Sequence, residues 1–124
     1  MQMLFQWDLS PQEPAKLEKK FWREAKAADS TREFANALFE GAAKDVAALD
    51  ELIVKHADNW RFERLAAIDR AILRLGIHEL RAAETPYKVV LNEAVDLAKK
   101  FSSAESGAFV NGILDAAHKA LPAK

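Results

Sequence analysis

The sequence predicts an all-α protein, and three observations support this prediction. The 124 residues include 24 alanines and 14 leucines, which favour helix, but only 6 valines, 5 isoleucines and 2 threonines, which favour strand. Apolar residues recur three or four positions apart through most of the chain, as on one face of a helix. No stretch of useful length alternates apolar and polar residues as a strand does. We therefore expect about seven helices and no strands.

Two short helices are expected first. Residues 1–9 are apolar and aromatic, and they fit the end of a helix whose beginning is missing, because nothing like a capping residue precedes them. Residues 10–14 contain two prolines, which interrupt helical hydrogen bonding and indicate a loop. Residues 15–28 form the second helix, in which Leu17 and Phe21 begin an apolar face. A separate basic face of this helix is interpreted as solvated surface.

Two further helices are expected before the middle of the chain. Asp29 or Ser30 can cap the third helix, and Glu33 follows Ser30 by three residues, as a capping box requires. Its apolar stripe starts at Phe34 and continues at four-residue intervals. A break near residues 41–44 separates it from a fourth helix, which continues to His56.

The second half predicts three helices and most of the core. Four apolar residues from Leu65 to Leu75 are spaced three, four and three apart, which predicts a central helix ending near Leu80. Pro86 fits the start of the next helix, a polar link follows at residues 102–107, and Pro122 ends the last helix. The residues expected to be mostly buried are Leu65, Ile68, Ile72, Leu75, Val90, Ala94, Leu97, Val110, Ile113 and Leu114.

Length and composition exclude several classes of protein. A chain of 124 residues suits a single domain spanning residues 1–124, and 50% hydrophobic residues exclude a disordered chain. The absence of cysteine excludes disulfides and thiolate chemistry. No uncharged apolar run approaches the roughly 20 residues of a membrane helix, and no signal peptide is visible, so we expect a cytoplasmic protein with no membrane partner. A net charge of −1 argues against a nucleic-acid binder that acts alone.

No catalytic, metal-binding or nucleotide-binding motif is present. The sequence has no phosphate-binding or dinucleotide-binding glycine motif and no H-E-x-x-H. His56, His78 and His118 each lack a second histidine three or four residues away, as a helical metal site would need. We therefore expect no enzymatic activity, no metal and no cofactor.

Two asparagines and three aromatic residues stand out from the helical pattern. Asn92 and Asn111 lie beside apolar faces, so we expect both amides to be hydrogen-bonded to backbone and to lock helices together. Gly112 suggests a close approach between helices at the same place. Phe5, Phe101 and Phe109 lie near loops or helix ends, where aromatic rings can stack on single-stranded bases.

Four segments, in order, resemble those of NusB-type transcription antitermination factors. Residues 2–9, QMLFQWDL, are similar to the end of the first helix of that family, and residues 68–80, IDRAILRLGIHEL, to its central helix. Residues 85–101, TPYKVVLNEAVDLAKKF, and residues 109–114, FVNGIL, resemble the last two helices. The resemblance covers nearly the whole chain and implies a fold of two helical bundles packed across each other.

The turn at residues 58–61 is the expected boundary between the two bundles. It gives subdomains of approximately residues 1–58 and 59–124 within the one domain. The resemblance also implies a function without chemistry. The family binds single-stranded boxA-type leader RNA as a heterodimer with the NusE-type small-subunit ribosomal protein, and the complex helps the transcription elongation complex resist termination. A homodimer is a further possibility within the family.

The resemblance also implies which residues bind these partners. The positions that match the RNA surface of the family are Gln2, Phe5, Phe101, Glu105 and Phe109. Asp69 matches an acidic position implicated in contact with the ribosomal protein or RNA. Phe5 replaces a common tyrosine, and Ala108 replaces a lysine that would contact phosphate. The arginine-rich start of the family's first helix has no counterpart here, so we expect weak RNA binding by this form alone.

Two other functions stay open. Some ribosomal-RNA cytosine methyltransferases carry a NusB-like RNA-binding domain, and such an appendage would be followed by a catalytic domain. A helical adaptor that binds only proteins would need no RNA surface. Binding of boxA-like and scrambled RNA, with and without the ribosomal protein, separates the adaptor from the antitermination factor.

Overall fold

The computed structural model describes residues 1–57 and 65–121, which form seven α-helices and no strand. This confirms the predicted all-α class. The expected turn at residues 58–61 lies outside the described residues, so the division into subdomains stays a prediction. The helices are α1 (Gln2–Leu9), α2 (Pro14–Glu24), α3 (Asp29–Lys44), α4 (Val46–His56), α5 (Ala67–Ala82), α6 (Tyr87–Phe101) and α7 (Ala104–Ala120).

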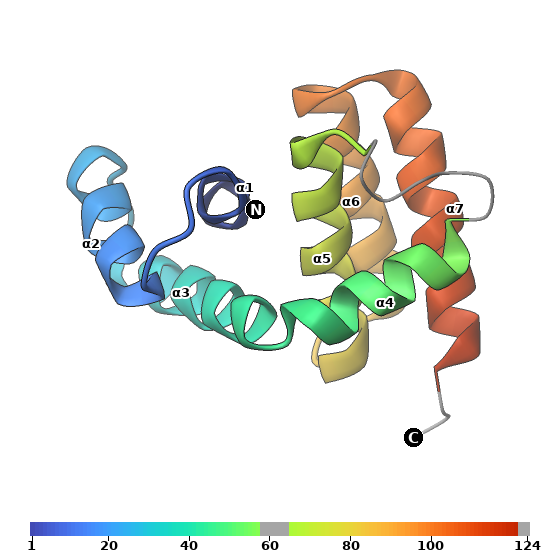
Figure 1. Cartoon of the computed structure of the whole chain (residues 1–124), viewed down its shortest axis with the longest axis horizontal. Coiled ribbons are helices and arrows are strands. Elements are labelled where there is room, and N and C mark those ends of the chain that lie inside the picture. The colour runs from blue at the N-terminus through green and yellow to red at the C-terminus, as the bar shows by residue number, and fades with distance from the viewer. Residues whose placement is uncertain (58–64, 122–124) are drawn as a thin grey trace.

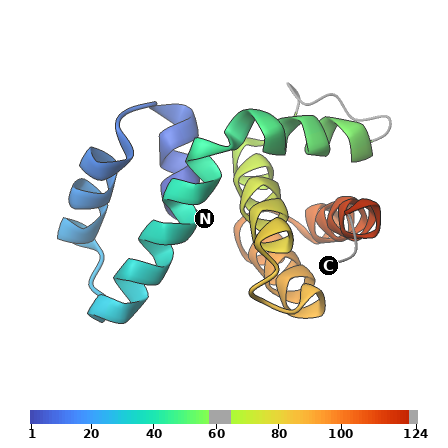
Figure 2. The same cartoon turned by 90° about the horizontal axis from the view of Figure 1, so that it is seen from below.

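The helices are arranged as two bundles around α5. Figures 1 and 2 show α1, α2 and α3 on one side and α5, α6 and α7 on the other, with α4 running from the first group across the second. Helix α5 contacts α1, α3, α4, α6 and α7. Eight of its 16 residues are buried, which explains why its apolar residues are not confined to one narrow stripe. The prediction of a central helix is therefore confirmed.

The core matches the residues that the helical spacing predicted. Of the ten expected core residues, Ile68, Leu75 and Leu97 are partly buried against the core and the other seven are buried. Phe34 was expected to begin an apolar stripe, but it is 59% exposed, and Phe39 occupies the core position instead. No helix within residues 1–57 and 65–121 is both long enough and apolar enough to cross a membrane.

Three predicted helix boundaries need correction. Helix α2 ends at Glu24, because Ala25 is already extended, at φ −99° and ψ 123°. Helix α3 begins before Ser30 and has no side-chain cap, so the expected capping box does not form. Helix α7 begins at Ala104, because the Ser103 hydroxyl accepts the backbone N–H of Ser106 at 3.1 Å and caps it. The expected polar link is therefore mostly the first turn of α7.

Glycines determine how closely the helices pack at two places. A Cβ atom on Gly76 of α5 would lie 2.8 Å from Leu114 of α7, and one on Gly41 of α3 would lie 2.6 Å from the His78 ring. The break expected near residues 41–44 lies at Asp45 instead, because α3 continues through Gly41 to Lys44. The close approach expected at Gly112 is wrong, because a Cβ there would meet no atom within 4 Å.

Helices α2 and α3 bring two glutamates together. Glu18 is 9% exposed. Burial, the charge of Glu40 and a hydrogen bond with Glu40 raise the pKa of Glu18 to about 7. Since the folded pKa exceeds the ordinary value of 4.5, the folded state binds this proton more tightly than the unfolded state. The stabilising contribution is complete below pH 4.5 and is lost as the pH rises through 7.

Glu18→Gln should therefore stabilise the protein at pH 8 and have little effect at pH 5. The expected gain at pH 8 is up to about 3 kcal/mol, because each pKa unit corresponds to about 1.4 kcal/mol. Denaturant unfolding of wild type and variant at both pH values measures the difference. Glu24→Gln, on an exposed residue of the same helix, is the matched control and should show no such pH dependence. An equal effect of Glu18→Gln at both pH values would contradict the prediction.

Candidate nucleic-acid interface

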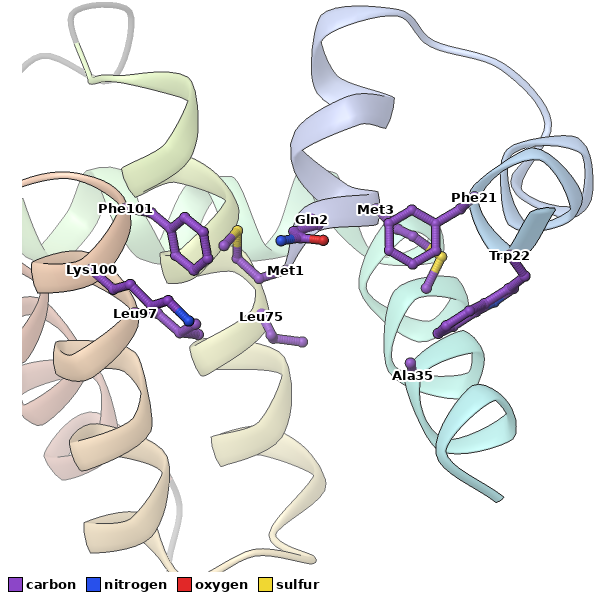
Figure 3. A pocket seen from close by; sticks show the side chains of 10 residues that line it. All are labelled: Met1, Gln2, Met3, Phe21, Trp22, Ala35, Leu75, Leu97, Lys100 and Phe101. Carbon is purple, nitrogen blue, oxygen red and sulfur yellow. The ribbon is translucent and has the colours of Figure 1, made fainter. Parts of the chain in front are cut away.

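The space between the two bundles brings together two of the predicted RNA-binding residues. Gln2 of α1 and Phe101 of α6 both line an inter-bundle pocket of about 370 Å³. Figure 3 shows their side chains at this pocket together with that of Met1. The rest of the lining is mostly apolar and comes from five helices: Met1, Met3, Phe21, Trp22, Ala35, Leu75, Leu97 and Lys100. Residues nearly 100 positions apart in the sequence thus form one surface.

Phe101 and Lys100 place an aromatic ring and a positive charge next to each other at this pocket. Phe101 is 40% exposed, so part of its ring is open to a ligand. The Lys100 Nζ lies 5.3 Å from the centre of that ring. A partly exposed ring can stack on a base, and a nearby ammonium can contact a phosphate. Lys100 was not among the predicted site residues, although it directly precedes Phe101 in the basic–aromatic sequence Lys99-Lys100-Phe101.

The other two predicted aromatic residues are placed differently. Phe5 and Phe109 are partly buried and pack against the hydrophobic core, and neither lines the inter-bundle pocket. Phe101 is therefore the most accessible of the three rings. Glu105, the remaining predicted RNA-binding residue, is exposed in the first turn of α7.

Asp69, the predicted partner contact, is buried. It is 7% exposed, and its Oδ2 accepts a hydrogen bond from the Ser106 hydroxyl at 3.1 Å. The Ser106 hydroxyl also lies 2.9 Å from that of Ser102. The carboxylate of α5 is thus joined to the first turn of α7, next to Glu105. A direct contact between Asp69 and a protein partner stays a prediction.

Within residues 1–57 and 65–121, Asn92 and Asn111 do not form the expected hydrogen bonds to backbone. Both are exposed and line a groove between α6 and α7, which also contains Lys99. The buried neighbours on the two helices, Leu91 and Val110, occupy the packing faces instead. An asparagine one residue from a buried position lies to the side of the packing face, because successive helical residues are about 100° apart. That offset could have been read from the sequence.

The described residues contain no group of three or more His, Asp or Glu side chains that could hold a metal ion. The polar groups of this surface are the amides of Gln2, Asn92 and Asn111, the ammonium groups of Lys99 and Lys100, and the carboxylates of Asp96 and Glu105. Such groups donate and accept hydrogen bonds or pair with phosphate, and they fit binding rather than chemistry.

Comparison of the sequence with known proteins gives a consistent result. A model of the NusB family matches residues 1–119. The transcription antitermination protein NusB of Sorangium cellulosum is 47% identical over 93% of this chain and 83% of its own length. The protein of the same name from Koribacter versatilis is 45% identical over 100% of this chain and 86% of its own length.

Solved structures are similar in fold as well as sequence. A crystal structure of the antitermination factors NusB and NusE in complex with double-stranded RNA has a TM-score of 0.85 and 34% identity, over 96% of this chain and 89% of the other. The solution structure of NusB from Aquifex aeolicus has a TM-score of 0.81 and 32% identity, over 98% of this chain and 87% of the other.

Proposed function

This chain belongs to the NusB family, and from that premise we propose that it is an RNA-binding transcription antitermination factor that works with a NusE-type ribosomal protein. The observation that carries the proposal is the similarity to a NusB chain that was solved in complex with NusE and RNA, at a TM-score of 0.85. The function is one of binding and not of catalysis.

The geometry supports a surface centred on the inter-bundle pocket. RNA would lie across the first turn of α1, the end of α6 and the start of α7, where Gln2, Phe101 and Glu105 are exposed. Phosphate contacts would position the strand, and stacked or hydrogen-bonded bases would supply sequence preference. Because the chain has a net charge of −1, we propose that a more basic partner extends the positive surface.

The proposal also covers the type of RNA, the place of action and the oligomeric state. We propose that the preferred RNA is single-stranded and of boxA type, that the complex acts on the transcription elongation complex in the cytoplasm, and that the free protein can form a homodimer. Asp69 would influence the ribosomal-protein contact. The membrane has no part in this function.

Direct binding measurements test the proposal. Wild-type protein is titrated with boxA-type RNA, with a scrambled single strand and with a duplex of the same length, each with and without the NusE-type protein. We expect boxA-type RNA to bind more tightly than the scrambled strand, and the NusE-type protein to strengthen that binding. Absence of RNA binding under every condition, with intact binding to the NusE-type protein, would favour an adaptor that binds only proteins.

Alanine substitutions should separate stacking from packing. Because Phe101 is 40% exposed, Phe101→Ala should weaken RNA binding by about 1–3 kcal/mol and leave the melting temperature nearly unchanged. Phe109 packs against the core, so Phe109→Ala should mainly lower the melting temperature. Fluorescence anisotropy and thermal unfolding measure the two effects. A large loss of stability in Phe101→Ala would make Phe101 a structural residue and remove it from the proposed surface.

A further inference from the structure

A groove between α6 and α7 is lined by other residues of α6 than those that line the inter-bundle pocket. The α6–α7 groove has a volume of about 540 Å³, and its polar lining residues are Asn92, Asp96, Lys99 and Asn111. Small residues of α7, Ala104, Gly107 and Ala108, complete the lining together with Val95. No described residue fills this groove. The RNA surface proposed above includes neither of the two asparagines.

Lys99 is held along the wall of this groove. A Cβ atom on Gly107 would lie 3.1 Å from Lys99 Cγ and 3.4 Å from Cε, so the aliphatic chain of the lysine crosses the glycine. Gly107 is buried as a result, whereas Lys99 is exposed overall. The packing restricts the lysine stem before any ligand binds, which reduces the entropy that a phosphate contact would cost.

The two asparagine side chains are available for a ligand. Both are exposed and line the same groove, and neither hydrogen-bonds to another residue in the described part of the chain. A carboxamide carries two N–H donors and a carbonyl acceptor. The edges of nucleobases carry complementary groups, and asparagine can pair with adenine through two hydrogen bonds.

The position of the groove favours RNA as the occupant. Lys99 and Asp96 are the charged residues that line the groove, so it suits a single phosphate contact beside base contacts and not a continuous track of phosphates. The groove reaches the start of α7, because Ala104, Gly107 and Ala108 line it, and Glu105 lies in the first turn of the same helix. A strand that crosses the first turns of α7 would enter it.

We propose that the α6–α7 groove extends the RNA path, with Asn92 and Asn111 reading base edges of single-stranded RNA and Lys99 contacting one phosphate. This inference rests on the proposed function. It assigns sequence discrimination to the two amides and sequence-independent affinity to the lysine, because base contacts specify whereas phosphate contacts only position.

The test compares wild type with Asn92→Ala, Asn111→Ala and Lys99→Met, in the presence of the NusE-type protein. The methionine keeps an unbranched chain over Gly107 and removes the charge. Lys88→Met, at an exposed lysine in the first turn of α6, is the matched control. Each variant is titrated with boxA-type and scrambled RNA at several salt concentrations, and its melting temperature is measured.

Each asparagine variant should reduce the affinity ratio of boxA-type to scrambled RNA by at least about fivefold, with binding of scrambled RNA unchanged. Lys99→Met should weaken both RNAs equally and make the salt slope shallower by about 0.7, as loss of one phosphate contact to a single strand predicts. Lys88→Met should change neither quantity. The asparagine variants should melt at the wild-type temperature or above it, because alanine favours helix more than asparagine does.

Unchanged ratios of boxA-type to scrambled RNA affinity in both asparagine variants would overturn the inference. The proposed function would stand in that case, provided that the wild type binds RNA. Weaker binding of the NusE-type protein by these variants, with an unchanged RNA ratio, would also overturn the inference and assign the groove to a protein contact. Failure of the wild type to bind any RNA would instead reject the proposed function, and this inference with it.

Discussion

Replacement of Arg74 by methionine is expected to lower the free energy of unfolding by about 3–5 kcal/mol, because it removes the arginine that pairs with Asp50 and leaves Asp8 with Arg70 as its remaining ion-pair partner. Arg74 is 5% exposed and donates two hydrogen bonds to Asp50, at 2.7 and 2.8 Å, and one to Asp8 at 3.0 Å. A loss of this size is a large fraction of the stability of a typical domain.

The cluster around Arg74 joins three helices. Asp8 lies on α1, Asp50 on α4 and Arg74 on α5, and Arg70 of α5 also donates to Asp8. Burial opposes ionisation of Asp8, but the hydrogen bonds and charges of the two arginines outweigh burial and lower its pKa. The substitution therefore affects the contact between the bundles and not only one helix.

Chemical unfolding at pH 7 measures the effect of Arg74→Met. Lys88→Met, which removes an exposed positive charge from a helix, should change stability by less than about 0.5 kcal/mol. A double variant that adds Asp50→Leu should recover part of the loss, because replacing a buried pair by apolar residues is often nearly neutral. A melting temperature of Arg74→Met close to that of wild type would contradict the prediction.

An arginine-rich segment fused ahead of Met1 should strengthen RNA binding by roughly a hundredfold at 0.1 M salt if three of its arginines contact phosphates. For single-stranded RNA the logarithm of the binding constant changes with the logarithm of salt by about −0.7 per phosphate, so three contacts add about −2 to the slope. The gain should shrink as salt rises. It should apply to boxA-type and scrambled RNA alike, since phosphate contacts carry no sequence information.

A salt titration of both forms against both RNAs measures this effect. A segment of equal length with glutamine in place of each arginine is the control, and it should leave affinity and slope unchanged. Equal affinity and equal slope for the arginine-rich and original forms would show that the added segment does not contact RNA. The first turn of α1 would then lose its support as part of the RNA surface.

The sequence by itself determined the helices and most of the core. The spacing from Leu65 to Leu75 predicted the central helix, and Pro86 and Phe101 marked the limits of the next one to within a residue. Such features are local, because the period of 3.6 residues places apolar side chains on one face whatever the helix packs against. The same sequence also carried the resemblance to the NusB family.

Only the tertiary structure decided which residues meet. Gln2 and Phe101 share a pocket because α1 and α6 both pack on α5, and Asp69 is buried because the first turn of α7 lies over it. Asn92 and Asn111 lie in a groove because each is rotated away from its packing face. These outcomes depend on how whole helices are placed and rotated against one another, and the spacing of residues along one helix does not specify that.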